Sequence, residues 1–127
     1  MHTVREVVFV NEQHVPVELE WDELDEGCIH VLALSDEKPI GTARLQLNGH
    51  IGRMAVLKHW RNQGVGSAML QRLLVEIRQR KIRQAILNAQ IEAVGFYSQF
   101  GFQVEGDEFM DAGIPHVRMV LAPILNF

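Results

Sequence analysis

The sequence has one cysteine, no long apolar run and no sign of a secretory leader. Its single cysteine, Cys28, leaves no internal disulfide possible. Its longest apolar runs, such as residues 7–10, have four residues, whereas a membrane-spanning helix needs about 20. The first residues contain no basic stretch followed by an apolar segment and a cleavage site. We therefore expect a cytoplasmic protein that is not embedded in a membrane.

The sequence also lacks the patterns of a metal site and of a nucleic-acid interface. Its histidines show neither the HExxH spacing nor the paired-ligand spacing of a metal site, alone or together with Cys28. They are His2, His14, His30, His50, His59 and His116. A net charge of −4 at pH 7 argues against nucleic acid as the main partner. The sequence therefore predicts no metal, and no nucleic acid among its partners.

The composition is that of an ordinary globular domain. Apolar residues make up 47% of the 127 residues and charged residues 22%. A chain of this length is expected to form a single core. On folding it buries roughly two-thirds of its unfolded surface, so it needs no structural metal. We expect one domain over residues 1–127.

Charges of the two signs are separated along the chain. Residues 1–37 hold ten acids and one base, residues 38–90 hold ten bases and one acid, and residues 91–127 hold five acids and one base. If the segments form different faces, the middle suits a polyanionic ligand and the flanks suit a cationic one. The alternative is a set of solvated faces that neutralise one another. Charge alone leaves both interpretations open.

The hydrophobic pattern predicts a sheet flanked by helices. Thr3 and Glu6 form a capping box, which predicts a first helix over residues 3–11, and the acidic stretch 18–27 is expected to be a loop. Three antiparallel strands are expected over 29–35, 40–47 and 51–56, the last two joined by a turn at Asn48 and Gly49. The leucine spacing predicts an amphipathic helix over 67–80. A strand over 85–89, a helix over 92–100 and final strands over 102–104 and 117–121 complete the expected order.

The segment 61–67, RNQGVGS, lies between a strand and the amphipathic helix. The missing Cβ atoms of Gly64 and Gly66 let backbone N–H groups approach a ligand, and the helix N-terminus favours an anion. No lysine follows Gly66 as in a Walker loop, and no third glycine or later acid gives a dinucleotide fingerprint. The pattern does fit Arg-x-x-Gly-x-Gly at the start of a helix. A phosphate site is one interpretation, and a plain strand-to-helix turn is the other.

In this loop the chain resembles the GNAT superfamily of N-acetyltransferases. Residues 113–116 and 9–13 are similar to a subgroup of small bacterial members. Two further segments carry the resemblance: 53–56, RMAV, before the loop, and 96–102, FYSQFGF, after it. The resemblance implies a mixed, mostly antiparallel central sheet flanked by helices. The family usually begins with a strand before its first helix, whereas only Met1 and His2 precede the expected helix. The usual first strand is therefore expected to be missing.

The resemblance also implies acetyl-CoA as the cosubstrate and assigns residues to it. The strand 53–56 would pair with the pantetheine arm, the loop 61–67 would bind the pyrophosphate, and Tyr97 would be the general acid. Gln90 stands where many members have an asparagine that contacts CoA. The implied cosubstrate-binding residues are Met54, Ala55, Val56, Arg61, Asn62, Gln63, Gly64, Val65, Gly66, Ser67, Gln90 and Tyr97.

The chemistry of amide formation sets what the catalytic residues must do. A strand amide near Val56 would serve as the oxyanion donor. A phenol with a pKa of about 10 is a weaker acid than a thiol near 8.5, so proton transfer from Tyr97 to the thiolate is uphill by roughly 2 kcal/mol. A hydrogen bond from Tyr97 to the sulfur is then the larger part of its role, and the alternative is a core aromatic with a satisfied hydroxyl. Glu12 and His116 are the preferred general bases. The other candidates are Glu18, Glu20, Asp22, His30 and Glu92.

Together these features predict an acyltransferase. It would move an acetyl group from acetyl-CoA to a primary amine of a small molecule or peptide, by direct attack in a ternary complex. The alternative is a non-catalytic sensor or interaction module that binds acetyl-CoA. Exposed strand edges make a homodimer an expected form of association.

Overall fold

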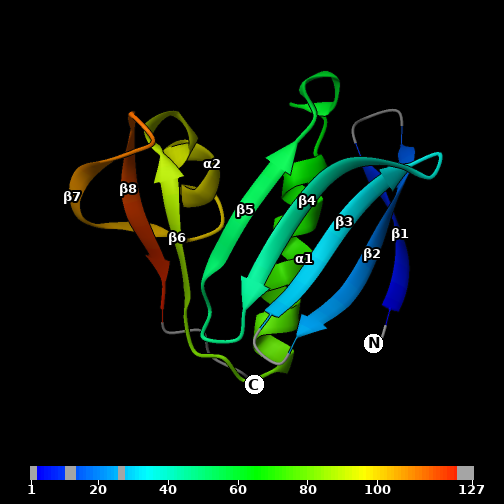
Figure 1. Cartoon of the computed structure of the whole chain (residues 1–127), viewed down its shortest axis with the longest axis horizontal. Coiled ribbons are helices and arrows are strands. Elements are labelled where there is room, and N and C mark those ends of the chain that lie inside the picture. Colours follow the sequence, from blue (N-terminus) through cyan, green and yellow to red (C-terminus); the bar gives the residue numbers. More distant parts are fainter. Residues whose placement is uncertain (1–2, 11–13, 26–27, 123–127) are drawn as a thin grey trace.

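The computed structural model describes residues 3–10, 14–25 and 28–122 (Figure 1). Its strands are β1 (Thr3–Val10), β2 (Val15–Asp25), β3 (Cys28–Ser35), β4 (Lys38–Gln46), β5 (Ile51–Val56), β6 (Ala85–Gln90), β7 (Gln103–Asp111) and β8 (Ile114–Leu121). Its helices are α1 (Val65–Gln79) and α2 (Val94–Ser98), with short 3₁₀ turns η1 (Lys58–Trp60) and η2 (Ile91–Ala93). None of the helices within these described ranges is long and apolar enough to cross a membrane.

The first five strands form one antiparallel sheet, in the order β1-β2-β3-β4-β5. Helix α1 covers one face of this sheet (Figure 1). Its apolar stripe, which includes Leu70, Leu73 and Ile77, is fully buried. Gly41 on β4 permits close packing, because a Cβ there would lie 3.1 Å from the Met69 Cε. The expected amphipathic helix is confirmed, and it begins two residues earlier than predicted, at Val65.

The last three strands form a second antiparallel sheet, in the order β6-β8-β7. The two sheets meet where His50 forms a parallel bridge with Ile86, and the Ile86 amide donates a hydrogen bond of 2.9 Å to the Gly49 carbonyl. From this shared end β5 and β6 diverge (Figure 1). A β-bulge contributes, because Arg53 and Met54 on β5 both lie opposite Ala43 on β4. Such a bulge increases the local twist and turns β5 away from a flat continuation of the sheet.

The fold class is confirmed: the sheets are mostly antiparallel and helices flank them. Strands β3, β4, β5 and β6 occupy the expected segments within two residues. The helix expected over 92–100 is reduced to η2 and α2, and the final strands are longer than predicted.

The start of the chain differs from the prediction, because the helix over residues 3–11 is wrong. Residues Thr3–Val10 form strand β1, which pairs antiparallel with β2. A strand therefore stands at this edge, where the sequence predicted the usual first strand to be missing. Burial alternates with the period of a strand: Val10 is 3% exposed, whereas Phe9 is 65% exposed. Glu6, which suggested a capping box, instead forms an ion pair of 2.9 Å with Arg72 on α1.

The acidic loop expected over 18–27 is also wrong, since β2 extends to Asp25. Val17, Leu19 and Trp21 are buried, and acids occupy the alternate positions. This is the pattern of a strand with one face in the core and one in solvent. The number of acids obscured the alternation.

Candidate functional site

The turn before α1 presents backbone amides to solvent. Gly64, the residue before the helix, has φ 91° and ψ 3°, and Asn62 has φ 62°. No side chain caps the helix, and its first turn contains no acid. The first N–H groups of a helix lack intrahelical partners, and they favour an anion. The left-handed residue at Gly64 followed by the helical Val65 aims these amides outward.

This turn is fixed to the end of β5 and to α2. The Arg61 Nε donates a hydrogen bond of 3.1 Å to the Val56 carbonyl, and the Gln63 Nε2 donates one of 3.1 Å to the His59 carbonyl. A Cβ on Gly66 would lie 3.8 Å from both the Val56 Cγ2 and the Phe96 Cζ. The first turn of α1 therefore meets the diverging end of β5 and the helix that follows β6. Arg61 also lines a smaller, mostly apolar cavity of about 360 Å³ beside β4.

β5 is the last strand of the five-stranded sheet, so its outer edge has no neighbouring strand within the described part of that sheet. The Leu57 amide donates a hydrogen bond of 2.8 Å to the Ile40 carbonyl, which shows that Leu57 and Ile40 form a hydrogen-bonded pair of the β4–β5 ladder. Because hydrogen-bonded and non-hydrogen-bonded pairs alternate in an antiparallel ladder, the Val56 amide points away from β4. It thus faces the side on which β6 diverges. Ala55 is exposed on the same strand.

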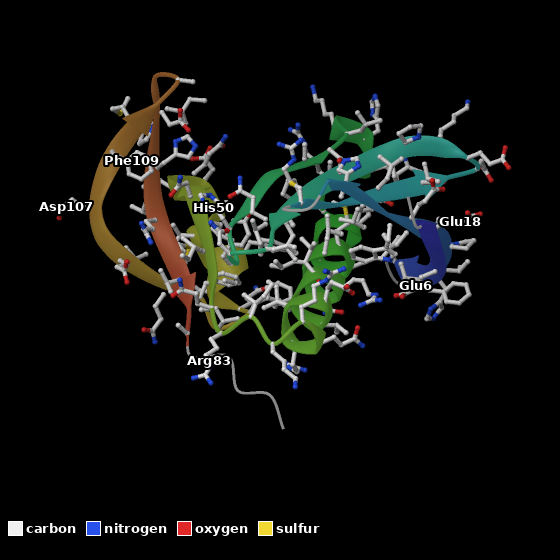
Figure 2. The ribbon with its side chains drawn as sticks, turned by 60° about the horizontal axis from the view of Figure 1, so that its bottom comes forward. Glu6, Glu18, His50, Arg83, Asp107 and Phe109 are labelled. Carbon is white, nitrogen blue, oxygen red and sulfur yellow. The ribbon has the colours of Figure 1, made fainter. Side chains whose placement is uncertain are left out.

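A cavity of about 440 Å³ lies between the diverging strands. Met54 on β5, Gln90 on β6, Tyr97 on α2 and His116 on β8 all line it. These four predicted site residues come from four different elements, and the fold brings them to one cavity. Figure 2 shows His50 between the two sheets, at the end where they join.

Tyr97 lies across the cavity from β5. Its hydroxyl donates a hydrogen bond of 3.8 Å to the Met54 Sδ. Its ring packs edge-on against Phe96, with the ring centroids 5.1 Å apart, and against Phe102 at 6.0 Å. Burial raises the pKa of the Tyr97 phenol above 10.0. The hydroxyl therefore remains a donor at neutral pH, and a sulfur atom already accepts its hydrogen bond.

His116 is held in one orientation by two contacts. Its Nδ1 lies 2.7 Å from the Ile114 carbonyl oxygen, and since a carbonyl only accepts, Nδ1 carries the proton. The neutral ring then has its lone pair on Nε2. The ring stacks on Phe109, with centroids 6.0 Å apart and planes at 25°. This geometry suits a proton acceptor.

The other candidate bases lie elsewhere. Glu12 lies outside the described residues. Glu18, on β2, lies well away from His50 (Figure 2) and is not among the residues that line the cavity. The His30 Nε2 lies 2.5 Å from the Thr42 Oγ1, within the five-stranded sheet. Glu20, His30 and Glu92 do not line the cavity, and the side chain of Asp22 is outside the described part of the structure.

Three polar residues of the cavity, His50, Asn88 and Asp111, are not among the predicted site residues. Asn88 lies two residues before Gln90 on β6, so strand alternation places both side chains on one face. Asp111 ends β7, immediately before the two-residue turn Ala112-Gly113, in which φ is 53° and 76°. Two positive φ values in a two-residue loop are typical of a tight hairpin. The Asp-Ala-Gly segment was the available signal for that turn.

Comparisons with known proteins identify the family and the fold. The family model described as an acetyltransferase (GNAT) domain matches residues 2–123. The uncharacterized N-acetyltransferase YjcF of Bacillus subtilis (strain 168) is 42% identical over 121 residues, which cover 92% of this chain and 86% of YjcF. The structure of an acyl-CoA N-acyltransferase from Pseudomonas aeruginosa is similar, with a TM-score of 0.68 and 25% identity over 75% of this chain and 68% of that one. A GNAT family acetyltransferase from Elizabethkingia anophelis with acetyl-CoA bound has a TM-score of 0.62 and 14% identity over 76% of each chain.

Proposed function

The chain belongs to the GNAT acetyltransferase family, and from this premise we propose that it transfers an acetyl group from acetyl-CoA to a primary amine. The amine attacks directly, within a ternary complex. The observation that carries the proposal is the cavity between β5 and β6, which has the oriented side chains of His116 and Tyr97 on its walls. Acetyl-CoA supplies the acetyl thioester.

The residues present fit a diphosphate and its pantetheine arm. The uncapped N-terminus of α1, with Gly64 in the left-handed conformation, would hold the diphosphate through residues Gln63 to Ser67. The exposed edge of β5, from Met54 to Val56, would pair with the amide groups of the arm. Arg61 supports this arrangement by tying the loop to the Val56 carbonyl. A GNAT family acetyltransferase with a similar fold has acetyl-CoA bound, which supports acetyl-CoA as the cosubstrate.

His116 would act as the general base. The ammonium form of the acceptor must lose a proton before its nitrogen becomes a nucleophile. With Nδ1–H committed to the Ile114 carbonyl, the Nε2 lone pair is available for that proton. The stacked Phe109 ring fixes the direction in which Nε2 points.

Tyr97 and the Val56 amide would act as hydrogen-bond donors. Since burial raises the Tyr97 pKa, the phenol is an even weaker acid than a free tyrosine. Donating a hydrogen bond to the departing sulfur is therefore its main contribution. The Val56 N–H, directed away from β4, would donate to the oxygen that gains negative charge.

The test combines calorimetry with a thiol-release assay. Acetyl-CoA should bind to the folded protein, and CoA should be released on addition of at least one primary amine from a panel of polyamines, amino sugars, aminoacyl compounds and peptides. Tight binding without release across the panel would favour the non-catalytic sensor. Absence of binding to both CoA and acetyl-CoA would refute the proposal.

A further inference from the structure

The side chains that line the β5–β6 cavity have an unusual charge balance. Among the described residues that line it, Asp111 is the one carboxylate, and neither lysine nor arginine is present. The remaining polar groups are imidazoles, amides and the Tyr97 hydroxyl. We infer that the acceptor is a compact, non-acidic primary amine whose ammonium group binds Asp111 before it loses its proton. This inference rests on the proposed acetyltransferase function.

The backbone register places Asp111 beside the proposed base. Asp111 pairs with Ile114, and Phe109 pairs with His116. Side chains two residues apart on a strand share a face, so Asp111 and His116 are diagonal neighbours on one face of the β7–β8 hairpin. Such neighbours lie about 7–8 Å apart. An ammonium group between them can contact the carboxylate and approach Nε2.

The hairpin turn fixes both side chains. Ile114 is the partner of Asp111, and its carbonyl also holds the His116 Nδ1 at 2.7 Å. The two residues between Asp111 and Ile114 form the tight turn. The carboxylate and the imidazole are therefore positioned by the same few backbone atoms. Because their positions are fixed relative to each other, the two side chains favour an acceptor whose ammonium group carries its positive charge at one particular place.

The cavity also limits the size and polarity of the acceptor. Its volume of about 440 Å³ lies toward the lower end of the range for small-molecule sites, and the acetylated end of the cosubstrate must share it. Gln90 lies opposite His116 across the β6–β8 pairing. With Asn88 it offers amide donors and acceptors to a hydroxyl or carbonyl group. A carboxylate or phosphate near the amine would be repelled by the Asp111 carboxylate, and the described lining residues include no lysine or arginine to offset that repulsion.

A matched pair of amines tests this inference. The compounds 3-aminopropanol and β-alanine have the same length and amines of similar basicity, and they differ in a hydroxymethyl group against a carboxylate. Their dissociation constants are measured by calorimetry with protein saturated in CoA, at pH about 8, where free imidazoles are neutral. We expect 3-aminopropanol to bind at least about tenfold more tightly, the effect typical of one charge-assisted hydrogen bond.

The Asp111→Asn substitution should bring the ratio of the two dissociation constants, β-alanine over 3-aminopropanol, to near one without changing the affinity for CoA. The control is Asp107→Asn, on the same strand, because Asp107 points away from the body of the protein (Figure 2); this variant should keep the wild-type ratio. Equal binding of the two amines, tighter binding of β-alanine, or no binding of either at tens of millimolar would overturn the inference. So would an Asp111→Asn variant that discriminates as the wild type does. Because these measurements require no turnover, they are independent of the CoA-release test of the proposed function.

Discussion

Replacing Gly64 by alanine tests whether the backbone of the loop, rather than any side chain, binds the diphosphate. Gly64 has φ 91°, a conformation that costs an L-residue about 1–2 kcal/mol. For a chain of this size, that corresponds to a fall in Tm of roughly 3–10 °C. Any relaxation of φ toward negative values also rotates the amides of Val65 and Gly66. We therefore expect acetyl-CoA to bind at least about tenfold more weakly, as if one hydrogen bond to a charged group were lost.

The matched control is Gly106→Ala. Gly106 has φ 84°, a Cβ there would meet no atom within 4 Å, and the residue lies in the exposed strand β7, away from α1. This variant should lose a similar amount of stability with no change in acetyl-CoA affinity. Differential scanning calorimetry measures the first quantity and titration calorimetry the second. A Gly64→Ala variant that is destabilised as Gly106→Ala is, yet binds acetyl-CoA like the wild type, would refute the role given to the loop amides.

Three further predictions concern the cavity. Tyr97 is the only tyrosine in the sequence, so the absorbance of the phenolate measures the ionisation of this residue alone. The titration midpoint should lie above 10.0, because burial raises the Tyr97 pKa. A midpoint at or below that value would contradict the structure. The same shift should lower the free energy of unfolding as the pH rises above about 10, because the phenol ionises first in the unfolded chain. The Tyr97→Phe variant should not show this loss. Its turnover should be slower by about tenfold or more, with unchanged acetyl-CoA affinity. The His116→Asn variant keeps a donor for the Ile114 carbonyl but lacks the Nε2 lone pair, so kcat should fall by about 100-fold. Part of the activity should return at higher pH, where more of the amine substrate is already neutral. Wild-type activity in this variant would exclude His116 as the general base. Finally, amide hydrogen exchange in β6 and β8 should slow when acetyl-CoA is added, and unchanged exchange there would contradict binding between β5 and β6.

The central part of the fold could be predicted because its signals are local. The leucine spacing of α1 and the short alternating segments of β3, β4 and β5 determine both their type and their buried face. The β1 and β2 segments were misassigned because their local signals compete with long-range ones. Thr3 and Glu6 have helix-capping spacing, but the pairing of β1 with β2 and the ion pair between Glu6 and Arg72, 66 residues apart, favour the strand.

The candidate site could be predicted only where a motif marks it. The loop at Gly64 and the segment around Tyr97 have recognisable spacing, and both lie at the diverging ends of β5 and β6. Asp111 and His50 have no local signature of function, because their position depends on the β7–β8 register and on the bridge between the two sheets. Such residues become candidates only when the pairing of distant strands is known.

The location of the cavity follows from how differently the two sheets are packed. The five-stranded sheet shares its core with α1, whereas all nine residues of β7 are exposed. Elements with few buried contacts open at lower free-energy cost than a packed core. Strand β7 can therefore open locally at a lower cost, whereas β8 is held in place, because its Val117 and Met119 are buried in the same core as α1.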